Sequence, residues 1–157
     1  MRYFFFRLFP LMLATLFLSA CSEPDLTDTQ GKGVFLKDDK GRWSVINIWA
    51  HWCAPCREEI PELNALASDG KVRVLGYDFD HSQGEKLVKK AKHMGIQFPV
   101  VTESPMALLA IKPPQALPAT MIVNPQGELV EVLYGPQTKE SLEQKIQSLK
   151  SKVKADD

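Results

Sequence analysis

The sequence predicts an α/β domain with a mixed central β-sheet and helices on both faces. From residue 33 onward, short apolar runs typical of strands alternate with amphipathic stretches typical of helices. The predicted order is β-α-β-α-β, then a short helical segment, two strands and a closing helix, an order that indicates a mixed sheet. With 157 residues, the chain has room for one such domain.

The first half of the domain centres on one strand and the helix that follows it. Residues 34–36 predict a short edge strand, and residues 45–49 (VINIW) a central strand buried on both faces. A helix is expected over 54–68, where Asp69-Gly70 ends it. Its apolar residues recur at helical spacing: Ile60, Leu63, Leu66 and Ala67. Pro61 predicts a kink in that helix.

The remaining elements are predicted in the same way, strands from short apolar runs and helices from apolar residues at helical spacing. Residues 72–79 form a second central strand, residues 83–94 an amphipathic helix that ends at Gly95, and residues 98–101 a short strand. A helical turn or two follows over 106–111. The last elements are a hairpin and a helix: residues 119–123 and 129–133 flank the turn Asn124-Pro125-Gln126-Gly127, and residues 138–153 form the helix, with Thr138 as its N-cap.

The N-terminus has the pattern of a targeting segment rather than of part of the fold. Arg2 and Arg7 form a basic n-region, and the apolar stretch that follows, Leu8 to Leu18, is too short to span a bilayer comfortably. Leu18-Ser19-Ala20-Cys21 resembles the lipobox of bacterial lipoproteins, which implies cleavage of a signal peptide over 1–20 and lipidation of Cys21. The alternative is an ordinary cleaved signal peptide that leaves Cys21 as a stray thiol.

Residues 21–33 are expected to form the lipidated cysteine and a polar tether, and residues 34–153 the folded domain. A flexible tether of this length spans roughly 17–20 Å, so the domain would work close to a membrane. The expected location is the periplasmic side of the bacterial cell envelope. Ser22, in the position after the cysteine, favours the outer membrane by resemblance to enteric lipoproteins.

Charge and cysteine content limit the functions that the protein can have. Lysine plus arginine equals aspartate plus glutamate at 19 each, without a basic stripe, so nothing points to nucleic acid as a partner. A domain of this size does not need a disulfide for stability, so the three cysteines indicate chemistry rather than structural cross-links.

Cys53-Ala54-Pro55-Cys56 lies between a predicted buried strand and a predicted helix. Zinc would require four ligands, and there is no second cysteine pair, so no metal is expected. As a redox pair, Cys53 at the helix N-terminus would be favoured as the nucleophilic thiolate by unpaired backbone donors and the helix dipole. Cys56, deeper in the helix, would resolve the mixed disulfide.

The stretch Asn47-Ile-Trp-Ala-His-Trp-Cys-Ala-Pro-Cys-Arg-Glu-Glu-Ile-Pro-Glu-Leu63 closely resembles the TlpA-like family of membrane-anchored or exported disulfide reductases with a thioredoxin-like fold. The likeness continues in Leu117-Pro-Ala-Thr120 and Asn124-Pro-Gln-Gly-Glu-Leu-Val130. The resemblance implies an enzyme, a thiol–disulfide oxidoreductase, that needs no cofactor.

The resemblance also implies two further site residues. Pro118 would be a cis-proline that faces the cysteine pair and leaves the Leu117 backbone free to bind an extended substrate; alternatively, Pro118 simply starts an edge strand. Glu59 would manage the protons of the cysteines, or else be a solvated carboxylate. Asn47 stands where cytosolic thioredoxins carry a buried aspartate, which suggests that Glu59 has taken over that task.

Two tryptophans and a histidine lie directly before the CxxC motif. Trp49 is predicted to be core, and Trp52 a flat surface beside the sulfurs that contacts substrate. His51 either tunes the thiolate or is an ordinary exposed loop residue, and the second interpretation is favoured.

The preferred function is reduction of oxidised exported proteins, with electrons from a membrane thiol donor. One alternative is a protein thiol oxidase or isomerase with the same site. Another, from a different class, is a metal-delivery chaperone that uses CxxC as its ligands. Nothing in Ala54-Pro55 decides the redox direction, because it depends on how far the thiolate is stabilised.

Overall fold

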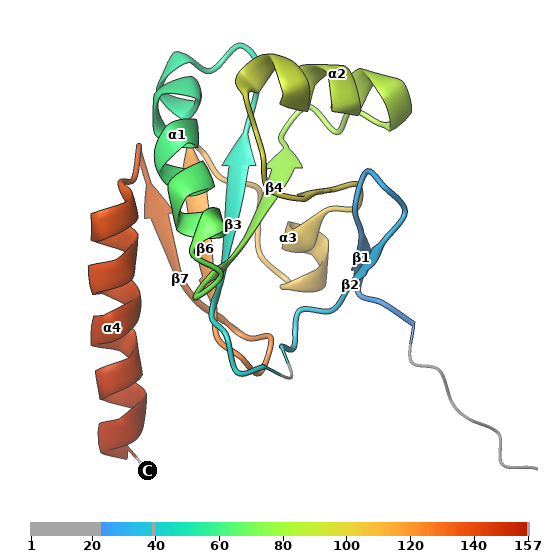
Figure 1. Ribbon diagram of the computed structural model, residues 1–157. Coiled ribbons are helices and arrows are strands. Elements are labelled where there is room, and N and C mark those ends of the chain that lie inside the picture. The colour runs from blue at the N-terminus through green and yellow to red at the C-terminus, as the bar shows by residue number, and fades with distance from the viewer. Residues whose placement is uncertain (1–22, 39, 157) are drawn as a thin grey trace, which may run out of the picture.

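The structure is a computed structural model that describes residues 23–38 and 40–156. Its centre is a five-stranded sheet with helices packed around it (Figure 1). The predicted signal peptide, Cys21 and Ser22 lie outside the described residues. Within the described part, no helix is both long and apolar enough to cross a membrane.

The sheet has the strand order β5-β4-β3-β6-β7 and is mixed, as predicted. β3 (Ser44–Trp49) is its central strand, and all six of its residues are buried. β4 (Arg73–Asp78) and β5 (Val100–Val101) continue it in parallel, whereas β6 (Ala119–Val123) pairs with β3 antiparallel and β7 (Leu129–Tyr134) closes the far edge. A strand hydrogen-bonded on both edges and covered on both faces shows a nearly continuous apolar run, which β3 has apart from Ser44 and Asn47.

Alternate residues of β3 face two separate cores. Val45 and Trp49 point into a core built with α1 (Ala54–Ser68), α2 (Gly84–Met94) and α4 (Lys139–Asp156). Ile46 and Ile48 point into the opposite core, which α3 (Pro105–Leu108) covers through Met106. The prediction of helices on both faces is therefore confirmed.

The N-terminal hairpin corrects the predicted tether. β1 (Leu26–Thr27) and β2 (Gly33–Val34) pair antiparallel, and Leu26 is only 2% exposed within the second core. The backbone N–H of Thr29 donates to Val100 O at 2.9 Å, which ties the hairpin to the sheet edge. The expectation of a flexible tether to residue 33 is thus wrong from Leu26 onward. The burial of Leu26 and a few backbone hydrogen bonds hold this mostly polar segment against the sheet.

Most other element boundaries agree with the predictions within a few residues. α1 covers the predicted range, and Pro61 lies inside it. The Oγ1 of Thr138 accepts the Ser141 N–H at 3.1 Å, which confirms it as the N-cap residue of α4. The differences are small: β2 ends before Phe35, β5 has two residues, and α3 ends at Leu108.

Candidate active site around Cys53 and Cys56

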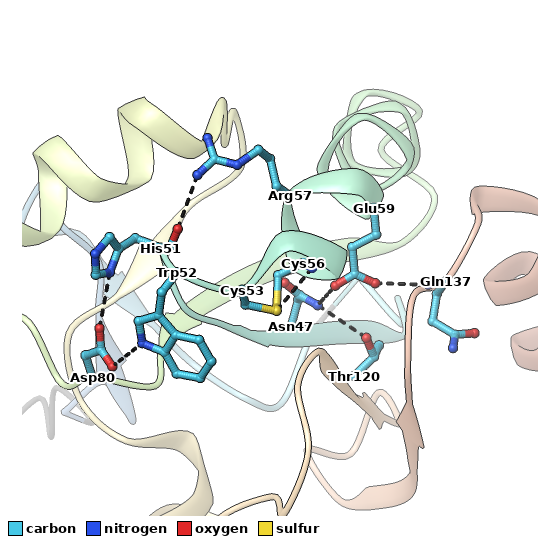
Figure 2. Close-up of a disulfide and its surroundings, with 10 residues drawn as sticks. All are labelled: Asn47, His51, Trp52, Cys53, Cys56, Arg57, Glu59, Asp80, Thr120 and Gln137. Carbon is cyan, nitrogen blue, oxygen red and sulfur yellow. Dashed lines mark hydrogen bonds and ion pairs between the residues drawn. A yellow bond between two sulfur atoms is a disulfide. The ribbon is translucent and has the colours of Figure 1, made fainter.

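The disulfide lies between the end of β3 and the start of α1, at the carboxyl end of the central strand (Figure 2). A disulfide bond joins Cys53 and Cys56, whose Cα atoms are 5.3 Å apart. The chain turns sharply after Trp49, and the N–H of Cys53 donates to Ala50 O at 3.1 Å. This turn places the first cysteine at the start of the helix.

The two cysteines occupy different positions in α1. Cys53 is the N-cap residue, and its Sγ accepts the backbone N–H of Cys56 at 3.2 Å. Pro55 stands in the first turn, where its missing N–H costs nothing. Cys56 is fully buried, whereas Cys53 keeps a small exposed surface. Cys53, at 5% exposure, is therefore the more accessible of the two residues.

Glu59 lies one turn beyond Cys56 and points into the core rather than into solvent. The residue is 2% exposed, so the interpretation as a solvated side chain is wrong. Oε1 accepts the Asn47 Nδ2–H at 2.7 Å, and Oε2 accepts the backbone N–H of Gln137 at 2.9 Å. Asn47 reaches Glu59 because both lie on the side of the sheet that α1 covers, and Nδ2 also lies 3.4 Å from Thr120 Oγ1 on β6.

Burial sets the proton affinity of Glu59. Desolvation raises its pKa from 4.5 to about 7, although the hydrogen bonds from Gln137 and Asn47 oppose that rise. The Oδ1 of Asn47 is buried and has no partner among the described residues. A carboxyl group with a pKa near 7 can accept or release a proton at neutral pH, as a general acid–base residue must.

The peptide bond between Leu117 and Pro118 is cis. Pro118 is buried, and its carbonyl accepts the N–H of Gly135 at 2.9 Å, which fixes the loop at the start of β6. Leu117 packs against the core cluster that contains both cysteines. Within residues 23–38 and 40–156, neither the N–H nor the C=O of Leu117 makes a hydrogen bond. The cis conformation expected of Pro118 is thus present, beside unpaired backbone groups.

The two tryptophans that flank the turn differ as predicted in burial. Trp49 is fully buried in the core, whereas Trp52 is 59% exposed. The Trp52 indole is nonetheless fixed, because its Nε1–H donates to Asp80 Oδ1 at 3.0 Å. His51 is exposed and lies 3.4 Å from Asp80 Oδ2.

The charged residues that surround Trp52 and His51 were not identified from the sequence. They are Asp78, Asp80 and Lys90, at the end of β4 and on α2. A signal was available: β4 runs parallel to β3, so residues that follow it emerge at the same sheet edge as the cysteines. The backbone N–H of Gln137, which binds Glu59, carried no signal because every residue but proline has such a donor.

The described residues contain no group of three His, Cys, Asp or Glu side chains arranged to hold a metal ion. The side chains present at the site supply three chemical groups. These are a dithiol–disulfide couple, one buried carboxyl group and an anchored aromatic ring. Together they suit exchange of a disulfide with a second molecule.

This site on this fold defines a thiol–disulfide oxidoreductase with a thioredoxin-like architecture. The model of the AhpC/TSA family matches residues 19–132, and the chain belongs to that family. The predicted resemblance to TlpA-like proteins is confirmed by the relatives below.

Two curated relatives are both thiol-disulfide oxidoreductase ResA. The protein of one Bacillus cereus strain is 34% identical over 128 residues, which cover 79% of this chain and 73% of the relative. That of Bacillus subtilis (strain 168) is 32% identical over 117 residues, 72% and 64% of the two chains. Among solved structures, StoA from Bacillus subtilis superposes with a TM-score of 0.61 at 22% identity, covering 76% of this chain and 92% of StoA. The StoA match supports the fold.

Proposed function

We propose that this protein is an extracytoplasmic reductase of protein disulfides that uses Cys53 as nucleophile and Cys56 as resolving thiol. The observation that carries the proposal is the asymmetry of the pair: Cys53 caps the helix and is 5% exposed, whereas Cys56 lies within the helix and is 0% exposed. The ResA relatives support the thiol–disulfide chemistry.

The reaction starts from the reduced protein. The Cys53 thiolate attacks one sulfur of the substrate disulfide, forms a Cys53–substrate disulfide and expels the other substrate sulfur as a thiolate. Cys56 then loses its proton and attacks the Cys53 sulfur, which closes the internal disulfide and expels the second substrate thiolate. Overall, two electrons and two protons pass to the substrate, and the structure represents the oxidised product.

Glu59 would receive the proton that Cys56 must lose before it can attack. It is the buried carboxyl group one turn further along the same helix, and its pKa of about 7 suits proton exchange at neutral pH. The hydrogen bonds from Asn47 and Gln137 hold the carboxylate in one orientation and stabilise it once deprotonated.

Leu117 and Pro118 would bind the substrate backbone. An extended peptide that pairs with the N–H and C=O of Leu117 would form a short β-bridge with the loop that precedes β6 and bring its disulfide to Cys53. Trp52, with its exposed ring, would contact the side chains next to that disulfide.

Lipidation at Cys21 would hold the domain at a membrane, on the periplasmic side of the envelope, where oxidised exported proteins are the substrates. Because the folded domain begins at Leu26, only four residues separate it from the anchor, a reach of about 18 Å at most. A membrane thiol protein would be the electron donor, and Ser22 favours the outer membrane for the anchor.

The reduction potential of the Cys53–Cys56 couple tests the proposed direction. The full chain in detergent is equilibrated with thiol–disulfide buffers, and the reduced fraction is measured by alkylation and mass spectrometry. We expect a value of roughly −230 mV or lower, toward that of thioredoxin. A value near roughly −120 mV would identify an oxidant and overturn the direction, while leaving the site intact.

A further inference from the structure

A single carboxylate holds both residues that lead into Cys53. Asp80 Oδ1 accepts the indole N–H of Trp52 at 3.0 Å, and its Oδ2 lies 3.4 Å from His51 Nδ1 (Figure 2). Asp80 follows β4, whereas Trp52 follows β3, and the two are 28 residues apart in sequence. The hydrogen bond therefore connects the loop before Cys53, which follows β3, to the loop that follows β4.

Lys90 holds Asp80 in turn. Its Nζ lies 2.6 Å from Asp80 Oδ2 and 3.3 Å from Asp78 Oδ2, so one ammonium group from α2 bridges two carboxylates. Asp78 is buried, and its side chain also accepts the backbone N–H groups of Asp80 and Ser82. A partly buried, hydrogen-bonded ion-pair network of this kind resists rearrangement far better than an isolated surface pair.

The network leaves the face of the Trp52 ring open. The residue is 59% exposed although the only polar group of its side chain, the indole N–H, is hydrogen-bonded. A large aromatic surface in a fixed orientation loses little conformational freedom when a partner packs on it, which is why tryptophan is frequent at the centres of interfaces.

We infer that Asp80 and Lys90 are positioning residues that hold Trp52 as a docking platform for an apolar side chain next to the substrate disulfide. This inference rests on the proposed function, since it concerns how the same reaction selects polypeptide substrates. Asp80 and Lys90 act through the indole and take no part in the sulfur chemistry.

The test is the kinetics of a synthetic substrate with the full chain in detergent. Two peptides joined by a disulfide, each with a leucine beside its cysteine, are reduced with dithiothreitol as electron source. Asp80→Leu is expected to raise KM about 2- to 10-fold, the worth of one lost hydrogen bond, with kcat unchanged. Asp80→Asn keeps an acceptor for the indole N–H but turns an amide NH2 toward Lys90, so its KM is expected to lie between those of the parent chain and Asp80→Leu.

A double variant shows whether Asp80 acts through Trp52. Trp52→Phe removes the indole donor and is expected to raise KM by a similar factor, and adding Asp80→Leu to it should have no further effect. Lys90→Met is expected to raise KM as well. Lys89→Met is its matched control, because Lys89 is exposed on the same helix and pairs only with Glu85 among the described residues.

Time-resolved tryptophan anisotropy gives a readout that is independent of catalysis. Trp43 and Trp49 are buried, so fast local rotation that is present with Trp52 and absent in Trp52→Phe belongs to Trp52. Asp80→Leu is expected to add a nanosecond component that the parent chain lacks. An unchanged KM in Asp80→Leu, or an equal rise in the Trp52→Phe background, would overturn the inference. A parent chain that cannot reduce the peptide would instead overturn the proposed function.

Discussion

The two sulfurs of the disulfide lie in surroundings of opposite character. On the Cys53 side, Trp52 and His51 are exposed, and Asp80 is paired with a lysine. On the Cys56 side, the polar residues Glu59 and Asn47 are buried. The Glu59 carboxyl is hydrogen-bonded only to neutral groups among the described residues, the Asn47 amide and the Gln137 backbone N–H. One turn of helix separates the solvent edge from the core.

The carboxyl groups on the two sides show what this difference does. Lys90 donates a hydrogen bond that holds the pKa of Asp80 below its usual range, so Asp80 stays charged and serves as a fixed acceptor. Burial raises the pKa of Glu59 to about 7, so Glu59 can change its protonation state. The same functional group thus becomes a structural anchor outside and a proton carrier inside.

The largest expected effect is on the sulfurs themselves. Cys53→Ser removes the nucleophile and Cys56→Ser removes the resolving thiol, so steady-state reduction of the peptide disulfide should fall by more than about 10³-fold in each. Turnover is followed by release of the fluorescent product peptide. Cys21→Ser is the matched control, and retention of its activity separates the redox pair from the third cysteine.

Stability distinguishes the two tryptophans. Trp49→Ala should lower the free energy of unfolding by about 3–5 kcal/mol, because it empties a fully buried site. Trp52→Ala should cost less than about 1 kcal/mol, because the ring is mostly exposed. Urea unfolding of the oxidised chain, followed by far-ultraviolet circular dichroism, measures both. Equal losses would contradict the assignment of one ring to the core and the other to the surface.

The pH dependence of stability isolates Glu59. In the folded chain it keeps its proton up to about pH 7, whereas unfolded it releases the proton near 4.5. The folded state therefore binds more protons between these values, and stability is lost as the pH rises through this interval, by about 3 kcal/mol. Glu59→Gln should remove this dependence and be more stable than the parent chain at pH 8.

The control for that experiment is Glu58→Gln. Glu58 neighbours Glu59 but is exposed, so its substitution should leave the pH profile of stability unchanged. A parent chain whose stability does not fall between pH 4.5 and 7 would show that the buried carboxyl is already charged.

A smaller effect is expected on the rate at which the mixed disulfide resolves. Without the Glu59 carboxylate, Cys56 must lose its proton to solvent, and Glu59→Gln should slow resolution by about 10²-fold at pH 7. Stopped-flow decay of a mixed disulfide preformed on Cys53 measures this step. The parent rate should rise with pH and level off above about 7, where Glu59 is deprotonated, whereas the rate of the Gln variant should keep rising above pH 7 because it depends on direct loss of the thiol proton to solvent. Identical profiles would exclude Glu59 as the proton acceptor.

The agreement between sequence and structure is best where a local pattern decides the outcome. α1 and its redox pair were predictable from CxxC after a buried strand, and the central strand from its nearly continuous apolar run. Trp49 and Trp52 were also assigned to the correct environments.

The features that the sequence did not predict depend on contacts that leave no pattern along the sequence. The β1–β2 hairpin has strands of two residues, held by bonds such as that from the Leu36 N–H to Asp25 Oδ2 at 2.6 Å. Such pairing leaves no alternation of apolar residues to detect. Asp80 and Lys90 were missed because they meet Trp52 only through the parallel pairing of β3 with β4 and the packing of α2.

Trapping of the mixed disulfide tests the asymmetry of the cysteine pair most directly. Reduced Cys56→Ser and Cys53→Ser chains are each mixed with the disulfide-linked peptide, and covalent adducts are quantified by intact-protein mass spectrometry. The account predicts a stable one-to-one adduct on Cys53 in the Cys56→Ser chain and almost none in the Cys53→Ser chain. An adduct that forms on Cys56 at a comparable rate would contradict the assignment of nucleophile and resolving thiol.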